Sequence, residues 1–226
     1  MIVARTARDL VVVAQRNQTY SAYKLPNLSH EYGELVDSGV GYLVYEPRND
    51  RWSKIANISA QSGHYLAETL NSFYNSINNS AEQNFIWVFY NDEMPDGAKT
   101  FDLGHTKGVI AFDETQGFWL IHSVPHYPTN TAPYLYPKSG HKYGQSFVCV
   151  TFALEELQAI SKQLYYTEPF IYASHLPQEA SIRFPTLKSV IQGQSATASP
   201  YIRRTELRSL DGVQFVHFAK HKKWHK

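Results

Sequence analysis

The sequence is poor in cysteine and in charge. Its 226 residues include one cysteine, Cys149, and only 18% of them are charged, with a formal net charge of +1. A lone cysteine excludes an intrachain disulfide. We interpret Cys149 as a buried, inert thiol because it lies in the apolar run 146–152. A nearly neutral chain also excludes binding to nucleic acid through overall positive charge alone, so any contact with DNA requires a local site.

Long hydrophobic runs are missing too. The first apolar run, at 10–14, is only five residues long, which is short for a signal peptide. No stretch reaches the roughly 18 apolar residues of a membrane span. We therefore expect no membrane segment, and an atypical N-terminus over residues 1–22 without a signal peptide. The glycosylation patterns, by contrast, favour the secretory pathway, because N-glycosylation occurs only there. Four acceptor patterns begin at Asn17, Asn27, Asn57 and Asn78.

What the sequence does contain is enough apolar surface for one substantial core. Hydrophobic residues make up 43% of the chain, and there are 16 Tyr, 12 Phe and 4 Trp. Hydrophobic periodicity predicts strands at 40–45, 85–90, 107–112, 118–123, 145–152 and 213–218, and helices at 66–77 and 153–164. Strands interspersed with two or three helices favour an α/β or α+β sandwich with both sheet faces partly covered.

Charge is distributed unevenly. Residues 203–226 contain seven Lys or Arg against Glu206 and Asp211, a net of +5, so the other 202 residues carry −4. A basic segment of this kind can contact phosphates, or it can be an ordinary solvated terminus.

The most specific local pattern is Gly104-His-Thr-Lys-Gly-Val109. Alternate residues of a strand point to the same face, so His105 and Lys107 are expected to project together, with Thr106 turned away. An ammonium binds a phosphate oxygen, and a neutral imidazole acts as nucleophile or general base. By itself a His-x-Lys pair is a weak signal, since a basic pair on an exposed strand is usually just a solvated face. No His-x-His spacing or carboxylate cluster suggests a metal ligand set.

This pattern is followed by Gly117-Phe-Trp-Leu-Ile-His-Ser-Val-Pro125, and together they resemble the deoxyribonuclease II family, a branch of the phospholipase D superfamily. The resemblance continues, in the same order, through segments 23–26, 89–92, 143–146, 162–165 and 218–220. It implies a phospholipase D-like sandwich with a mixed central sheet. It also implies acid-optimal, metal-independent and cofactor-free endonuclease action on DNA. That action would proceed through a phosphohistidine to 3′-phosphate ends, in a lysosomal or secreted protein.

The resemblance also assigns residue roles. His105 takes the role of the motif histidine, as nucleophile or general acid, and Lys107 that of the phosphate clamp. Asp113 falls near the superfamily's motif aspartate, with a spacing that differs by one. Ser123 matches the serine of a Gly-Ser-x-x-Asn element, and His126 stands where that element has its Asn.

Hairpin geometry provides a separate expectation about this site. If Phe112 faces Phe118 across a five-residue loop, Lys107 lies opposite Ser123 and shares its sheet face, while His122 points away. A slip of one residue reverses this and brings His122 to the site instead. The remaining histidines without motif context, at 64, 141 and 175, are interpreted as surface or packing residues.

The family places two His-x-Lys motifs in one site, whereas this chain has one in the matching context. His221-Lys-Lys223 has the same spelling in a different context, and we interpret it as a decoy. Residues 23–202 are thus expected to form one half of a pseudo-two-fold enzyme, and 203–226 a final strand and basic tail. The family resemblance would also give Cys149 a disulfide partner that is not in this sequence.

Two hypotheses follow. The chain is an acid deoxyribonuclease that takes its second His-x-Lys from a homodimer partner or from a C-terminal half outside this sequence. Alternatively, it is a catalytically inactive DNA-binding or decoy homologue.

Overall fold

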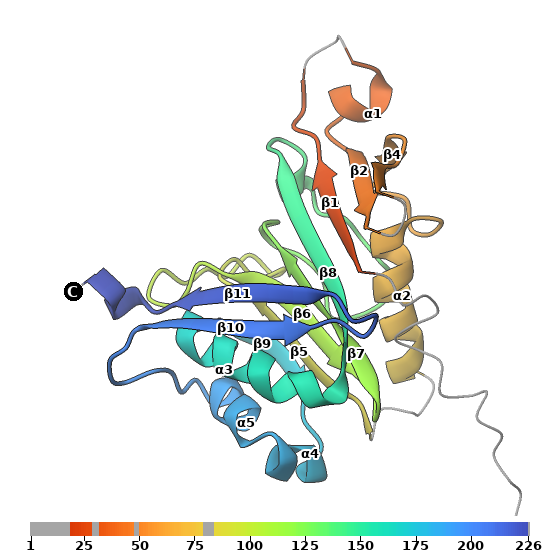
Figure 1. Cartoon of the computed structure of the whole chain (residues 1–226). Coiled ribbons are helices and arrows are strands. Elements are labelled where there is room, and N and C mark those ends of the chain that lie inside the picture. Colours follow the sequence, from red (N-terminus) through yellow and green to blue (C-terminus); the bar gives the residue numbers. More distant parts are fainter. Residues whose placement is uncertain (1–18, 29–31, 48–49, 79–83, 226) are drawn as a thin grey trace, which may run out of the picture.

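One large antiparallel β-sheet forms the centre of the molecule, with helices on both faces (Figure 1). The computed structural model describes residues 19–28, 32–47, 50–78 and 84–225. The order of strands across the sheet is β3-β2-β1-β8-β7-β6-β5-β9, and β4 pairs with β2. The strands are β1 (Tyr20–Lys24), β2 (Gly41–Glu46), β3 (Arg51–Trp52), β4 (Ala56–Asn57), β5 (Ile86–Asn91), β6 (Lys107–Phe112), β7 (Gln116–His122), β8 (Gln145–Ala153) and β9 (Ile171–His175).

Five helices accompany the sheet in the described part of the chain, besides short 3-10 turns. They are α1 (Glu34–Asp37), α2 (Tyr65–Asn78), α3 (Leu157–Thr167), α4 (Gln178–Arg183) and α5 (Pro185–Ile191). Leu66, Leu70 and Phe73 recur on one face of α2 and are fully buried, as the spacing of three and four residues predicts.

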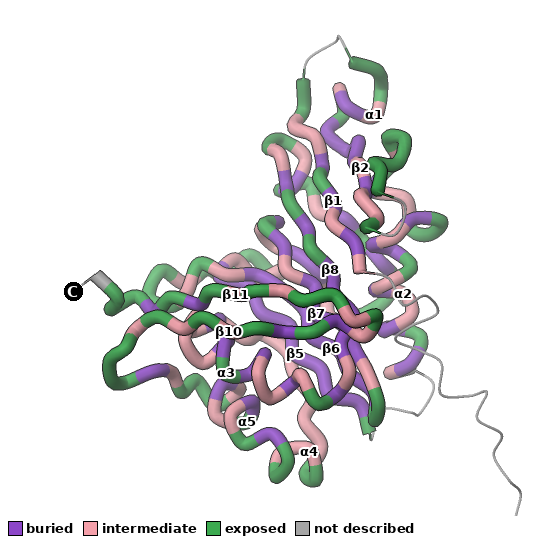
Figure 2. Tube along the Cα trace, in the orientation of Figure 1, coloured by how far each residue is buried: buried purple, intermediate pink, exposed green. Residues whose placement is uncertain are grey.

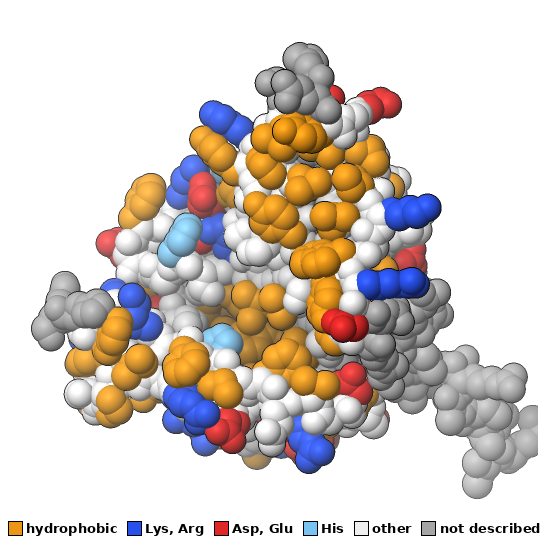
Figure 3. All heavy atoms as spheres, turned by 45° about the horizontal axis from the view of Figure 1, so that its top comes forward, with side chains coloured by type: hydrophobic (Ala, Val, Ile, Leu, Met, Phe, Trp, Pro, Cys, Tyr) orange, Lys and Arg blue, Asp and Glu red, His pale blue; other side chains and the backbone are white. Residues whose placement is uncertain are grey.

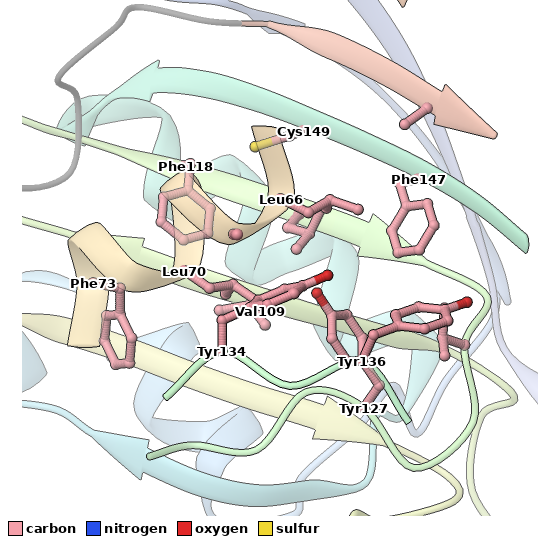
Figure 4. Close-up of a cluster of buried hydrophobic side chains, with 14 of the residues drawn as sticks. Leu66, Leu70, Phe73, Val109, Phe118, Tyr127, Tyr134, Tyr136, Phe147 and Cys149 are labelled. Carbon is pink, nitrogen blue, oxygen red and sulfur yellow. The ribbon is translucent and has the colours of Figure 1, made fainter. Parts of the chain in front are cut away.

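Each face of the sheet has its own core. On one face, α2 packs over aromatic side chains of the sheet and of the loop after β7, which Figure 4 shows around Phe118, Tyr127, Tyr134 and Phe147. On the other face, α3 and α5 cover residues such as Ile110, Trp119 and Val150. Because both faces are covered, the central strands β5 and β6 are buried along their whole length (Figure 2).

The basic C-terminal region forms a two-stranded ribbon, β10 (Ile202–Arg208) and β11 (Gln214–Lys220). It lies across α3 in Figure 1, and the α3 residue Gln163 donates a hydrogen bond to the carbonyl oxygen of His217 at 2.9 Å. The expected strand at 213–218 is therefore present. Most of the expected basic tail belongs to this ribbon, on which Arg204, Arg208 and Lys220 are exposed.

The α+β expectation, a central sheet with helices on its faces, is confirmed. The sheet is not mixed: every described pairing within it is antiparallel. The expected boundary at residue 23 falls inside β1, whose sequence Tyr20-Ser-Ala-Tyr-Lys24 is too polar to stand out as a strand. Sequence periodicity also missed β9, β10, α4 and α5, because each is short and only partly buried.

The expected register of the β6–β7 hairpin is wrong by one residue. Phe112 pairs with Gly117, and Gly108 with Ile121. The reason lies in the turn, where the Asp113 carboxylate accepts hydrogen bonds from the backbone N–H groups of Thr115 and Gln116, at 2.7 and 2.8 Å. This Asx turn closes the loop one residue earlier than expected, so Gly117 belongs to the strand.

Compared with the expected register, the observed one places every β7 side chain on the opposite face of the sheet. His122, one residue beyond the Gly108–Ile121 pair, comes opposite Lys107, and Ser123 takes the opposite face. The structure therefore has the register of the open alternative, in which His122 shares the sheet face of Lys107.

Several expectations concern residues outside the described part. Residues 1–18 of the expected N-terminal segment are among them, and three of the four glycosylation patterns include such residues. The fourth begins at Asn57, an exposed residue of β4. None of the helices in the described ranges is both long and apolar enough to cross a membrane.

Candidate functional site

The candidate site lies where β5 ends and β6 begins. These strands are antiparallel neighbours, and Asn91, the last residue of β5, pairs with Lys107, the first residue of β6. Asn91 fixes the loops around this end, because its side-chain amide donates to the carbonyl oxygens of Val124 and Tyr127 at 3.0 and 2.8 Å. The next residue, Asp92, is thereby placed beside the His-x-Lys segment.

A single carboxylate holds both motif residues. Asp92 Oδ2 lies 2.7 Å from His105 Nδ1, and Asp92 Oδ1 accepts a hydrogen bond from Lys107 Nζ. Asp92 and Lys107 are buried, whereas the His105 side chain is 83% exposed. His105 and Lys107 therefore meet at one group, although His105 lies in a bend before β6 and not on the strand that the spacing predicted. That group is an acid that the sequence analysis did not include.

The charges at this site favour an ionised Asp92. Burial acts to raise the pKa of its carboxyl group, but hydrogen bonds and charge from Lys107 and His105 outweigh burial, so the pKa is lowered. A carboxylate at Nδ1 fixes the neutral tautomer of His105 with its proton on Nδ1. The Nε2 lone pair then belongs to the exposed edge of the ring and is available to a substrate.

Glycine occupies both motif positions, 104 and 108, for steric reasons. A Cβ on Gly104 would lie 1.7 Å from the carbonyl oxygen of Thr167, at the C-terminus of α3. A Cβ on Gly108 would lie 2.3 Å from the hydroxyl of Tyr90. The spacing Gly-His-Thr-Lys-Gly thus includes two positions where the backbone approaches its neighbours too closely for any side chain.

His122 lies deep beneath the Lys107–Asp92 pair. Its ring is edge-on to Tyr127 at 5.2 Å and stacked on Phe147 at 6.3 Å. Nδ1 accepts the backbone N–H of Val124 at 3.2 Å. Burial lowers the pKa of His122 to about 3, and the Lys107 charge adds to this effect while Asp92 opposes it. His122 is therefore a neutral, buried neighbour of the site and is not exposed to a substrate.

Ser123 and His126 lie at the rim of the same end of the sheet. The Ser123 hydroxyl donates to Gln145 Oε1 at 2.5 Å and accepts the backbone N–H of Ser146 at 3.0 Å, so it is bound to β8. His126 Nδ1 lies 2.6 Å from the carbonyl oxygen of Met94, and Nε2 lies 3.8 Å from a carboxylate oxygen of Glu93. His126 is therefore close to the residue that follows Asp92, whereas Ser123 faces away from Lys107.

Asp113 is not brought to the site. It lies at the far end of β6, where its carboxylate closes the hairpin turn. His221 is also separate from the His105 ring: it is buried, stacked on Tyr201 at 5.3 Å, and 3.2 Å from a carboxylate oxygen of Glu168. Its motif partner Lys223 instead lies over the Tyr201 ring.

The three histidines without motif context contact aromatic rings. His64 is edge-on to Tyr42 and Tyr134, His141 is stacked on Tyr136, and His175 is stacked on Trp87. Among the described residues, no three His, Cys, Asp or Glu side chains are grouped so that they could hold a metal ion.

Sequence reasoning missed Asp92 and Glu93. A signal was present, because Asp92 ends the segment Phe89-Tyr-Asn-Asp92 directly after a strongly apolar strand. What the sequence did not supply was the pairing of β5 with β6, which places this acid against His105 and Lys107.

An exposed imidazole oriented by a buried carboxylate, beside a buried ammonium, defines a site suited to acid–base or nucleophilic chemistry on an anionic ester. The family model described as Deoxyribonuclease II matches residues 18–226. The chain therefore belongs to the deoxyribonuclease II family.

Three curated relatives illustrate the similarity. The chain is 34% identical to Deoxyribonuclease-2-alpha of Bos taurus over 206 residues, which cover 89% of this chain and 55% of the relative. It is 33% identical to Plancitoxin-1 of Acanthaster planci over 208 residues (91% and 57%). It is 35% identical to Cell death-related nuclease 6 of Caenorhabditis elegans over 207 residues (90% and 53%). The chain thus spans about half the length of the curated relatives it matches.

Proposed function

We propose that this chain contributes one half of the active site of an acid endonuclease that hydrolyses DNA phosphodiester bonds without a metal ion. The observation that carries the proposal is the shared Asp92 carboxylate, which orients the exposed His105 ring and neutralises the buried Lys107 ammonium. Membership of the deoxyribonuclease II family supports DNA as the substrate.

In the proposed reaction, one imidazole attacks phosphorus through its Nε2 lone pair, and the bond to the leaving 5′ oxygen breaks. A second, protonated imidazole gives its proton to that oxygen. Water then attacks phosphorus and gives a proton to the second imidazole, the P–N bond of the phosphohistidine breaks, and a 3′-phosphate and the free histidine are released. Asp92 serves His105 in either role, because it stabilises the positive charge on the ring both when the ring attacks and when it acts as the acid.

The proposed acid optimum follows from the need for one neutral and one protonated imidazole. With an ordinary pKa near 6.5, the protonated partner becomes scarce above neutral pH. Of the two locations that the family resemblance implies, lysosomal or secreted, the lysosome would provide such acidic conditions.

The second His-x-Lys would come from another copy of this chain or from a C-terminal half outside this sequence. An apolar face of the sheet that no described residue covers supports a packing partner: Tyr23, Leu43, Trp52 and Val148 line a groove over β1, β2, β3 and β8. Figure 3 shows hydrophobic side chains gathered on this upper part of the surface.

The test is plasmid cleavage at pH 5 with a chelator present, run beside size-exclusion chromatography. We expect cleavage by a dimer, loss of at least 10³-fold in His105→Ala, and a large loss in Asp92→Asn. The matched control is His175→Gln, because His175 pairs with Trp87 near the start of β5, whereas Asp92 follows the end of that strand. Retained cleavage in His105→Ala would refute the assignment of His105.

The second candidate function, DNA binding without cleavage, is favoured by one further observation. The outer face of the β10–β11 ribbon carries the exposed residues Arg204, Arg208, Phe218 and Lys220, a combination of cations and an aromatic ring suited to a nucleic-acid strand. This candidate predicts acid-pH DNA binding that weakens steeply with salt, and no cleavage at any protein concentration.

A further inference from the structure

We propose that Glu168, His221 and Lys222 form a clasp that fixes the backbone immediately before His105, so that Glu168 and Lys222 are positioning residues for the His105 ring. The name Glu168 clasp is used below for these three residues. The proposal rests on the function proposed above for His105, but its central measurement does not require activity.

The first step concerns the hydrogen bonds that fix the backbone on either side of His105. The backbone N–H of Gly104 donates to the carbonyl oxygen of Glu168 at 2.8 Å, and the N–H of Thr106 donates to the carbonyl oxygen of Gly104 at 2.8 Å. These two bonds flank His105. Because the His105 side chain is 83% exposed, little packing holds the ring. Its orientation therefore depends on these two backbone hydrogen bonds and on Asp92.

The second step concerns the Glu168 side chain, which is only 10% exposed. One carboxylate oxygen accepts a hydrogen bond from Ser195 at 2.7 Å. The other lies 3.2 Å from His221 Nε2 and 3.4 Å from Lys222 Nζ. Burial acts to raise the pKa of Glu168, but Ser195, His221 and Lys222 outweigh burial, and the pKa is lowered. The clasp is therefore built around an ionised carboxylate.

The third step links the clasp to the segment that leads into His105. Lys222 Nζ also donates to the carbonyl oxygen of Asp102 at 2.8 Å. One ammonium thus joins the Glu168 carboxylate to the backbone three residues before His105. The Glu168 backbone holds Gly104, so both ends of the segment 102–104 are tied to the same residue.

The fourth step concerns what secures the clasp itself. His221 follows β11, which runs across α3 (Figure 1). The His221 ring is 1% exposed and stacked on Tyr201. Its Nδ1 accepts the backbone N–H of Lys223 at 3.1 Å, and its Nε2 lies 3.2 Å from the Glu168 carboxylate. The segment His221-Lys-Lys223, which has the spelling of a second His-x-Lys motif, therefore has a structural role: it supports the backbone of the first motif.

The test uses hydrogen exchange of the Gly104 and Thr106 amides in the whole chain, followed by NMR or mass spectrometry. Lys222→Met keeps the aliphatic stem and removes the ammonium, and Glu168→Gln keeps the side-chain shape and removes the charge. We expect exchange at both amides to rise by about three- to tenfold in each variant, since a partly exposed charge-assisted bond is lost. Lys222→Arg should restore protection.

Lys188→Met is the matched control. It removes the same charge from an exposed position of α5, and Lys188 has no described side-chain contact with Glu168 or Asp102. If the wild-type chain cleaves DNA, Lys222→Met should lower kcat three- to tenfold relative to Lys188→Met, with the same KM in both variants. Unchanged exchange at Gly104 and Thr106 in both clasp variants would overturn the clasp. A wild-type chain that does not cleave DNA would instead count against an active site completed by a second copy of this chain, and the exchange result alone would then decide the clasp.

Discussion

The burial of His122 beneath Lys107 predicts that this residue makes the fold sensitive to acid. Its pKa in the folded chain is about 3, whereas an unfolded histidine has a pKa near 6.5. Between these values the unfolded chain binds a proton that the folded chain does not, so the free energy of unfolding falls as the pH drops below 6.5. For one such group the expected loss between pH 7 and pH 5 is about 2 kcal/mol.

The perturbation is His122→Asn, because an asparagine oxygen can replace Nδ1 as the acceptor for the backbone N–H of Val124. At pH 7 the smaller side chain should cost roughly 1–2 kcal/mol through lost packing against Tyr127 and Phe147. The variant should then lose about 2 kcal/mol less than the wild type on going to pH 5, since its side chain does not titrate. The two stability curves therefore converge in acid.

The assay is urea unfolding at pH 7, 6 and 5, monitored by tryptophan fluorescence and extrapolated to zero denaturant. His126→Asn is the control: it makes the same chemical change a few residues further along, and it should keep the wild-type loss because His122 is intact. If His122→Asn showed the same loss between pH 7 and pH 5 as the wild type, the assignment of His122 as a buried neutral base would be wrong.

Three further predictions concern single residues. Asp113→Ala should lower the free energy of unfolding by about 1–2 kcal/mol, because the Asx turn is lost. The specific DNA-cleaving activity of the folded protein should not change. A loss of activity without a loss of stability would instead give Asp113 a role in catalysis. Gly104→Ala should destabilise the chain by at least about 2 kcal/mol in thermal unfolding, because its Cβ would meet the Thr167 carbonyl at 1.7 Å. The Cys149 thiol, whose pKa burial raises to about 12, should react with Ellman's reagent at neutral pH only after unfolding, and rapid labelling of the folded chain would contradict its burial.

The sequence by itself determined the local elements and singled out the pair His105 and Lys107. Continuous apolar runs specified β5, β6 and the centre of the sheet, and the two motif residues do meet at one group, the Asp92 carboxylate. It also determined the family, because the hairpin 104–125 is a long and specific pattern.

The sequence did not determine pairing. The register of β6 and β7 depends on whether the turn closes at Gln116 or at Gly117, and the hydrogen bonds of a single carboxylate, Asp113, decide between them. A one-residue difference in a turn changes which face holds His122, so local pattern alone cannot decide it.

Only the tertiary structure assembled the site. Asp92 is thirteen residues from His105 in sequence and reaches it because β5 and β6 are antiparallel neighbours. Likewise, Lys222 reaches the carbonyl of Asp102 across 120 residues because β11 packs on α3. The sequence supplied the chemical groups. The tertiary structure set the distances between them, and it is the cations brought close to Asp92 and Glu168 that lower the pKa of both carboxyl groups.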